Sequence, residues 1–255
     1  MTALLDIAAV SRTFGGVNAV EDVSFSVAEG TATALIGPNG AGKTTLFNVI
    51  TNLIPPSAGS VKYRGEPIGH LPTEEIARMG LVRTFQTARV FPGMTVLENV
   101  AVGAHRLLTA SIAMQMVSST FARLEEERIR ARANVLLDIV GLSSQRDRAA
   151  TELPMGAQKL VEVIRALMSD PKLLLLDEPA AGLNDTETAE LLAMLSALRE
   201  AGITLLVVEH NMSLVMGLAD QIVVLDAGRT VAIGPPHEIR NNRAVINAYV
   251  GSEDV

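Results

Sequence analysis

The segment Gly37-Pro38-Asn39-Gly40-Ala41-Gly42-Lys43-Thr44 matches the pattern G-x-x-x-x-G-K-[ST] at every fixed position. The apolar run Thr31 to Ile36 before it predicts a strand, and the pattern from Thr45 to Leu53 predicts a helix that Pro55-Pro56 stops. A strand, a glycine-rich loop and a helix in this order direct backbone N–H groups at phosphates. The sequence therefore predicts a phosphate-binding loop and not an ordinary glycine-rich turn.

The residue types of this loop match the chemistry of a bound nucleotide. Glycines let the backbone curl around phosphates, Lys43 is expected to neutralise the β and γ phosphates, and Thr44 to bind Mg²⁺. The residues expected to contact ATP here are Gly37, Pro38, Asn39, Gly40, Ala41, Gly42, Lys43, Thr44 and Thr45. GTPases, kinases, helicases and transport ATPases share such a loop, so it predicts nucleotide binding without choosing among them.

A second motif supplies two carboxylates at the end of an apolar run. Leu173 to Leu176 predicts a buried strand, and Asp177 and Glu178 follow it directly. In P-loop proteins a strand-end aspartate binds magnesium near the phosphate loop, which is the role expected of Asp177. Glu178 can accept a proton from the attacking water and is the expected general base. Strand-end acids alone often mark only where a core strand reaches solvent, but the upstream loop favours the catalytic interpretation.

Apolar strands alternate with helices along the rest of the chain, which indicates an α/β fold with a parallel sheet. Leu4 to Val10 and Val20 to Val27 predict an antiparallel pair around Gly15-Gly16, and Thr95 with Glu98 predicts a capping box. The remaining predicted elements are helices at Phe121 to Val140, Gln158 to Ser169 and Glu187 to Glu200, a strand at Ile203 to Val208, and a hairpin of Ile222 to Leu225 with Thr230 to Ile233. We expect one domain over residues 1–255, with a core and β-subdomain at 1–90 and 157–235, a helical subdomain at 91–156 and a helical tail at 236–255.

Composition narrows the function classes. The 255 residues are 48% hydrophobic and 19% charged, with a net charge of −7, so the chain has no general attraction to nucleic acid, and its apolar surface predicts a protein partner. It has no cysteine, which excludes disulfides, and its first basic residue, Arg12, comes too late for a secretory signal. The longest uncharged stretch, Leu107 to Ala122, is too short and polar to span a bilayer. A membrane role would therefore need another subunit.

The motifs together resemble the ATP-binding subunits of ABC transporters over essentially the whole chain. The segments that give this resemblance are the phosphate loop, Gln86, a motif centred on Gly156, Leu173 to Pro179, and His210. The resemblance implies the ABC ATPase fold, which is a P-loop NTPase (RecA-like) core with an antiparallel β-subdomain and an inserted α-helical subdomain. It also implies hydrolysis of ATP with Mg²⁺.

The resemblance assigns roles to residues that no local pattern would single out. Gln86 looks like the glutamine that contacts magnesium and water and links the nucleotide state to the membrane subunit, and His210 looks like the histidine that contacts the γ-phosphate. Phe14 stands where an aromatic ring stacks on adenine, although a core phenylalanine is the alternative. The implied catalytic residues are thus Glu178, His210, Gln86 and Lys43, and the implied metal ligands are Thr44, Gln86 and Asp177.

Two segments depart from the family pattern. The signature Leu-Ser-Gly-Gly-Gln appears as Leu153-Pro154-Met155-Gly156-Ala157, followed by Gln158. Gly156 keeps the close backbone approach, and a helix from about Ala157 can still direct N–H groups at a phosphate, but the serine hydroxyl is lost at Pro154. Because this motif completes the site of the opposite subunit in the family, the change affects the partner's site. Asn184 likewise replaces the usual D-loop aspartate.

Arg83-Thr84-Phe85-Gln86, Glu178 to Asn184 and Glu209 to Met212 are similar to the ATPases of branched-chain amino-acid importers, the LivG type in particular. This similarity implies a second ABC ATPase subunit in a homo- or heterodimer, integral membrane permease subunits, and indirectly a periplasmic solute-binding protein. It also implies a peripheral location on the cytoplasmic face of the inner membrane. Residues Val90 to Ala122 are expected to dock the membrane subunit, unless they only cover the core.

Three other functions compete with amino-acid import. An ABC exporter or lipid-extraction ATPase would share every catalytic residue. A soluble ABC protein acting on nucleic acid would usually have coiled coils, tandem ATPase domains or a basic face, and the sequence shows none of these. A regulatory GTPase would need an Asn-Lys-x-Asp segment, which the sequence lacks.

Overall fold

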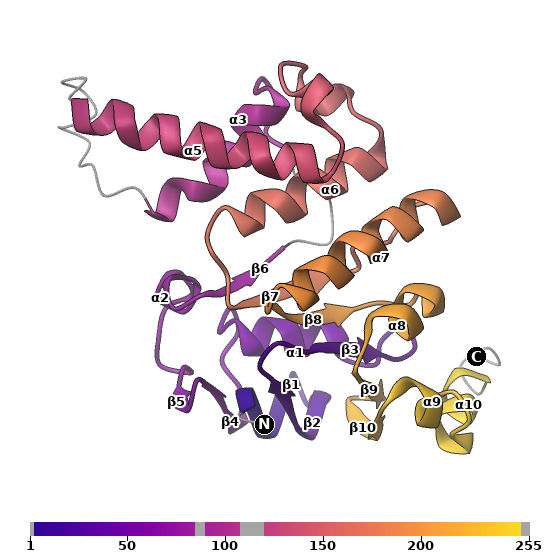
Figure 1. Ribbon diagram of the computed structural model, residues 1–255. Coiled ribbons are helices and arrows are strands. Elements are labelled where there is room, and N and C mark those ends of the chain that lie inside the picture. Colours follow the sequence, from indigo (N-terminus) through magenta and orange to yellow (C-terminus); the bar gives the residue numbers. More distant parts are fainter. Residues whose placement is uncertain (1–2, 85–89, 108–119, 251–255) are drawn as a thin grey trace. The chain divides into compact units, whose positions relative to one another are not determined.

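The computed structural model describes residues 3–84, 90–107 and 120–250, and the chain divides into two compact units (Figure 1). The first, called the sheet unit here, comprises Met1–Arg83, Lys172–Ala181 and Thr188–Val255. The second, called the helical unit, comprises Thr84–Pro171 and Gly182–Glu187. Within the described ranges, no helix is both long and apolar enough to cross a bilayer.

An antiparallel sheet of the sheet unit begins with β1 (Ala3–Phe14) and β2 (Val17–Ala28). These strands pair around Gly15-Gly16, which confirms the predicted antiparallel pair, although β1 continues past Val10 to Phe14. β4 (Ala58–Tyr63) and β5 (Glu66–Pro67) extend the sheet in the order β2-β1-β4-β5. The end of β1 thereby places Phe14 at a hairpin tip.

The other sheet has the order β10-β9-β3-β8-β7-β6. Its strands are β3 (Ala32–Ile36), β6 (Leu81–Arg83), β7 (Leu173–Asp177), β8 (Thr204–Val208), β9 (Gln221–Asp226) and β10 (Arg229–Gly234). β3, β7 and β8 are buried along their whole length, as expected of parallel strands covered on both faces, and β9 and β10 form the predicted hairpin. Because β3, β7 and β8 run parallel, their carboxyl ends lie at one edge.

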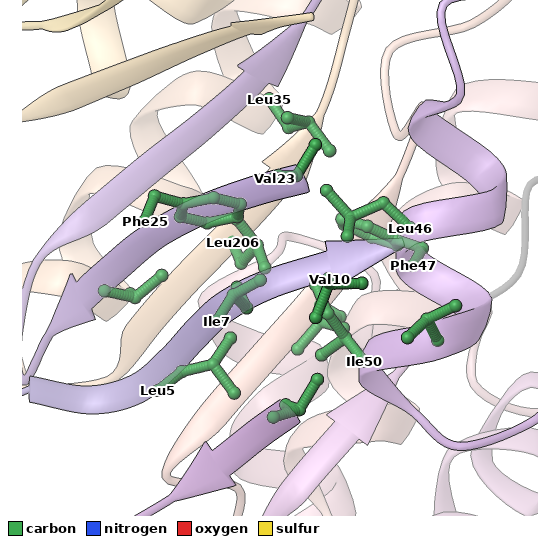
Figure 2. Close-up of a cluster of buried hydrophobic side chains, with 14 of the residues drawn as sticks. Leu5, Ile7, Val10, Val23, Phe25, Leu35, Leu46, Phe47, Ile50 and Leu206 are labelled. Carbon is green, nitrogen blue, oxygen red and sulfur yellow. The ribbon is translucent and has the colours of Figure 1, made fainter. Parts of the chain in front are cut away.

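The helices of the sheet unit are α1 (Lys43–Ile50), α2 (Thr73–Arg78), α8 (Met212–Leu218), α9 (Pro236–Ile239), α10 (Arg243–Val250) and most of α7 (Asp185–Glu200). Figure 2 shows the core in which side chains of β1, β2 and α1 meet Leu35 of β3 and Leu206 of β8. α1 begins at Lys43 and not at Thr45, because Gly42 adopts a left-handed conformation that turns the loop directly into the helix. Packing against this core fixes the position of α1, which begins directly after the phosphate loop.

The helical unit contains α3 (Val96–Ala101), η1 (Val102–Leu107), α5 (Thr120–Ile139), η2 (Ser143–Gln145), η3 (Ala150–Glu152) and α6 (Met155–Leu167). The capping box predicted at the start of α3 is confirmed, since Thr95 N donates to Glu98 Oε2 over 2.8 Å and Glu98 N donates to Thr95 Oγ1 over 3.2 Å. The predicted helix at Phe121 to Val140 corresponds to α5. α6 starts at Met155, earlier than expected, because Pro154 has the extended backbone of an N-cap residue.

Candidate functional site

The phosphate loop follows β3 and is held closely by its neighbours. Lys43 Nζ donates to the carbonyl oxygens of Gly37 over 2.6 Å and Pro38 over 2.9 Å. A Cβ at Gly37 would overlap the carbonyl oxygen of Leu225, and one at Gly42 would overlap that of Ala19. Glycine is therefore needed at both positions because backbone from other strands approaches them.

The N-terminus of α1 has the properties of an anion site. Its N-cap is Gly42, no side chain of the described residues caps it, and no acidic residue occupies its first turn. The first N–H groups of a helix have no partner within the helix, and the helix dipole adds positive charge there. Thr44 is exposed at this end. Phosphate oxygens can therefore bind to the N–H groups of this turn.

The electrostatic environment of Lys43 links the loop to the acidic motif. Its side chain is buried, and this burial lowers the pKa of the ammonium group, whereas the charges of Glu178 and Asp177 raise the pKa. Both carboxylates therefore lie close enough to Lys43 to raise the pKa of its ammonium group, although they come from the end of β7, far from the loop in the sequence. The structure brings the predicted phosphate-binding lysine and the two predicted carboxylates together.

The two carboxylates differ in their surroundings. Asp177 is buried, with Oδ2 accepting from Arg83 Nη2 over 2.7 Å, and its Oδ1 has no hydrogen-bond partner among the described residues. Glu178 is half-buried, adopts a φ of 48°, and donates its backbone N–H to Val208 O over 2.9 Å. A left-handed conformation is strained for glutamate and is found often at functional sites.

The residues around Asp177 fit a magnesium ion. A buried carboxylate oxygen without a partner is a ready ligand for a hard cation, and the Thr44 hydroxyl is an accessible second oxygen. Within the described ranges, no three His, Cys, Asp or Glu side chains group into a metal site of their own. An ion here would therefore take its other ligands from phosphate and water, as magnesium at nucleotide sites does.

Glu209 belongs to a segment that carries the family similarity, but the sequence assigned no role to its side chain. The side chain is fully buried, and its carboxylate accepts from three backbone N–H groups: Ala180 over 2.6 Å, His210 over 2.9 Å and Asn211 over 3.0 Å. It thereby joins the segment after Glu178 to the segment that holds His210. The only local signal for it is its place directly before the predicted histidine.

His210 and Phe14, the other residues of the sheet unit that are predicted to contact the nucleotide, are exposed to solvent. His210 is exposed after β8, and the next residue, Asn211, caps α8 by accepting from Leu214 N over 3.1 Å. Phe14 is 43% exposed, which excludes the alternative of a core phenylalanine. The guanidinium of Arg12 lies 4.6 Å from the centre of the Phe14 ring and covers one of its faces.

The signature segment belongs to the helical unit. α6 starts directly after Pro154, with no side-chain cap among the described residues. Gly156 is buried, and a Cβ there would overlap the Glu187 carboxylate. Asn184 and Glu187 bond reciprocally, since each donates its backbone N–H to the other's side chain over 3.0 Å. Asn184 thus caps α7.

Gln86 lies outside the described residues, as do residues 108–119 of the expected docking segment. The structure therefore gives positions for every predicted site residue except Gln86. The phosphate loop, Asp177, Glu178 and His210 follow the carboxyl ends of β3, β7 and β8, whereas Phe14 lies at the tip of the β1–β2 hairpin and Gly156 belongs to the other unit.

Two family models match the chain. Residues 20–181 match the model described as ABC transporter, and residues 229–255 match the model described as branched-chain amino acid ATP-binding cassette transporter. The first match spans most of the chain and includes the phosphate loop and the Asp177-Glu178 pair.

Individual relatives and a solved structure match over nearly the full length. The chain is 43% identical to the high-affinity branched-chain amino acid transport ATP-binding protein BraF of Pseudomonas aeruginosa, covering 97% of this chain and 98% of BraF. It is 42% identical to the corresponding protein LivG of Salmonella typhimurium, with the same coverage of each chain. The ADP conformation of MJ1267, an ATP-binding cassette of an ABC transporter, aligns with a TM-score of 0.86 at 34% identity, covering 98% of this chain and all of that one.

Proposed function

The chain belongs to the ABC transporter family, and we propose that it hydrolyses ATP to drive the import of branched-chain or related amino acids. The observation that supports hydrolysis best is the grouping of Lys43, Asp177 and Glu178 beside the N-terminus of α1. A loop that only bound a nucleotide would need the lysine and the helix, but not an acid able to take a proton from water.

The residues of the chain have separate tasks in this reaction. The N–H groups of the loop and the Lys43 ammonium bind the phosphates, with Lys43 exchanging its contacts with Gly37 O and Pro38 O for phosphate oxygens. Glu178 accepts the proton of the attacking water, and His210 contacts the γ-phosphate. Phe14 stacks its open face on the adenine. Gln86 completes the contacts near the water and the metal.

Magnesium is the ion that these residues suit. When bound, it neutralises negative charge that develops on the β and γ phosphates. Asp177, through its free Oδ1, and Thr44 would hold it, with Gln86 as the third protein group that the family pattern provides.

The proposed partners follow from the family. A second ATPase subunit, identical or related, would supply the signature motif for this site, and Gly156 at the start of α6 would serve the partner's site through backbone N–H groups. Membrane permease subunits would couple closure of the ATPase pair to transport, with this chain on their cytoplasmic face and a solute-binding protein on the other side. The match of residues 229–255 and the names of the relatives support branched-chain amino acids as the solute.

The test is reconstitution with the membrane subunits and the solute-binding protein in lipid vesicles, with ATP hydrolysis measured against added solute. We expect leucine, isoleucine or valine to stimulate hydrolysis. Glu178→Gln should bind ATP without turning it over, whereas Lys43→Ala should lose binding. Stimulation by a lipid and by no amino acid would instead support an exporter or lipid-extraction ATPase, and normal turnover in Glu178→Gln would exclude Glu178 as the base.

A further inference from the structure

Arg83 is placed to control the geometry of Asp177. It is the last residue of β6, which pairs with β7 so that Arg83 lies opposite Leu175. Alternate residues of a strand share a face, so the Arg83 side chain reaches along β7 to Asp177, where Nη2 meets Oδ2 at 2.7 Å. The Arg83 side chain is 13% exposed and that of Asp177 is 2% exposed. The ion pair is therefore shielded from water.

The guanidinium is itself fixed from other directions. Nη1 donates to Asn48 Oδ1 over 2.7 Å, and the guanidinium carbon lies 5.4 Å from the centre of the Phe47 ring. Both Asn48 and Phe47 belong to α1, the helix that begins at Lys43. Arg83 thus connects α1, the helix that follows the phosphate loop, to Asp177, the carboxylate proposed to bind magnesium. A planar guanidinium with several donors can make these contacts at once, and a lysine ammonium cannot reproduce them.

The ion pair with Arg83 involves Oδ2 of Asp177 and does not involve Oδ1. Oδ1 is buried and has no partner among the described residues. An orphaned buried oxygen is unfavourable unless something binds it. Oδ2 cannot rotate away without breaking the contact with Arg83, so Oδ1 keeps its direction.

We infer that Arg83 is a positioning residue, which holds Asp177 by Oδ2 so that Oδ1 remains oriented for magnesium. The inference rests on the proposed function, because it needs a magnesium nucleotide at the loop. Arg83 does not touch the nucleotide or the metal in this assignment, and it acts only through the aspartate. Partners of metal ligands have this effect in other sites, where their loss weakens metal binding by about 10- to 100-fold.

The test is the affinity for ATP with excess Mg²⁺ and with EDTA, measured by calorimetry on the purified chain. Lys43 and the loop bind phosphates in both conditions, whereas Asp177 contributes only when the metal is present. Arg83→Met should therefore weaken binding by about tenfold or more in Mg²⁺ and leave binding in EDTA unchanged. Asp177→Asn should have the same effect, and the double variant should show no further loss, because both changes remove one interaction.

Two further variants keep the test independent of folding. Arg83→Lys retains the positive charge, and Asn48→Ala retains the ion pair of Arg83 with Asp177. Each should therefore show a smaller loss of ATP affinity, again only when Mg²⁺ is present.

Arg199→Met is the matched control. Arg199 pairs with Asp220 at 3.3 Å, and Asp220 accepts from Ala32 N, at the end of β3 opposite the phosphate loop. Arg199→Met should change the affinity for ATP neither in Mg²⁺ nor in EDTA.

Equal losses in Mg²⁺ and EDTA would mean that Arg83 only stabilises the fold, and this would overturn the inference. Additive losses in the double variant would also overturn it, because Arg83 would then act independently of Asp177. An unsubstituted protein that binds no ATP in either condition would contradict the proposed function together with the inference. Unchanged magnesium dependence in Arg83→Met contradicts the inference alone.

Discussion

The buried carboxylates Asp177 and Glu209, at the carboxyl ends of β7 and β8, have different kinds of hydrogen-bond partner. Asp177 has a cationic partner, whereas Glu209 has backbone N–H groups as its partners. A buried carboxylate is tolerated only when such contacts compensate its desolvation. Glu209 thereby fixes the backbone of Ala180 and His210, two segments that come from different strands. These contacts predict that Glu209 stabilises the backbone of the site.

Glu209→Gln is expected to lower both stability and turnover. A glutamine has one acceptor oxygen and an NH₂ group, so at least one of the N–H groups of Ala180, His210 and Asn211 loses its acceptor. An unsatisfied buried donor is unfavourable by about 1–3 kcal/mol, which chemical unfolding should detect. ATP hydrolysis should also fall because His210 shifts. Glu152→Gln, at an exposed glutamate, is the control. Unchanged stability in Glu209→Gln would contradict this role.

At the scale of elements, the helix N-termini divide by the way in which they are capped. Asn184 caps α7 and Asn211 caps α8 through side-chain oxygens. α1, α2, α6 and α9 have no side-chain cap among the described residues, and of these α1 begins at the phosphate loop and α6 at the signature motif. The first N–H groups of α1 and α6 are thereby available to an anion, although α2 and α9 show that an uncapped start does not by itself mark a phosphate site.

Asn184 gives a prediction about helix capping, since its side chain caps α7. Asparagine and aspartate are about equal as N-cap residues, and alanine is worse by about 1 kcal/mol. Asn184→Ala should therefore lower the free energy of unfolding by about that amount, and Asn184→Asp should leave it nearly unchanged. Thermal or urea unfolding measures both. A loss of the same size in Asn184→Asp would show that the reciprocal bond with Glu187 does not act as a cap.

At the level of the whole chain, other subunits of a transporter are the expected partners, and the helical unit exposes apolar side chains within its expected docking segment, Val90 to Ala122. Phe91 is 43% exposed and Met94 is 37% exposed, just before the capping box of α3. Exposed apolar groups of this kind are common in protein interfaces. The Arg165 guanidinium packs on the Phe91 ring, which holds the ring in place.

Met94→Glu should weaken assembly with the membrane subunits while ATP binding by the isolated chain remains normal. A charge placed in an apolar interface must be desolvated without a partner, so we expect association to weaken by about tenfold or more. Co-purification and vesicle transport measure the loss, and calorimetry measures ATP binding. Ile233→Glu changes another exposed apolar residue, in β10 of the sheet unit, and should assemble normally. Loss of ATP binding in Met94→Glu would contradict a docking role.

Much of the fold could be predicted from local patterns, and the failures were at boundaries. The antiparallel pair of β1 and β2, the hairpin of β9 and β10, and the Thr95–Glu98 capping box were predicted from residues close together in the chain. The starts of α1 and α6 were placed too late, because the left-handed Gly42 and the extended Pro154 allow the helix to begin directly after the loop. Gln86 and the domain limits remain predictions.

The identities and local order of the proposed reacting groups could be predicted from sequence, because the phosphate loop and the Asp177-Glu178 pair are short motifs with fixed spacing. The side chains that surround these groups could not be predicted in this way. Arg83 meets Asn48 and Asp177 across separations of 35 and 94 residues, and Glu209 meets Ala180 across 29. Such contacts depend on which strands are neighbours in the sheet and on their register. No local pattern encodes that choice, which arises from burial of the whole core.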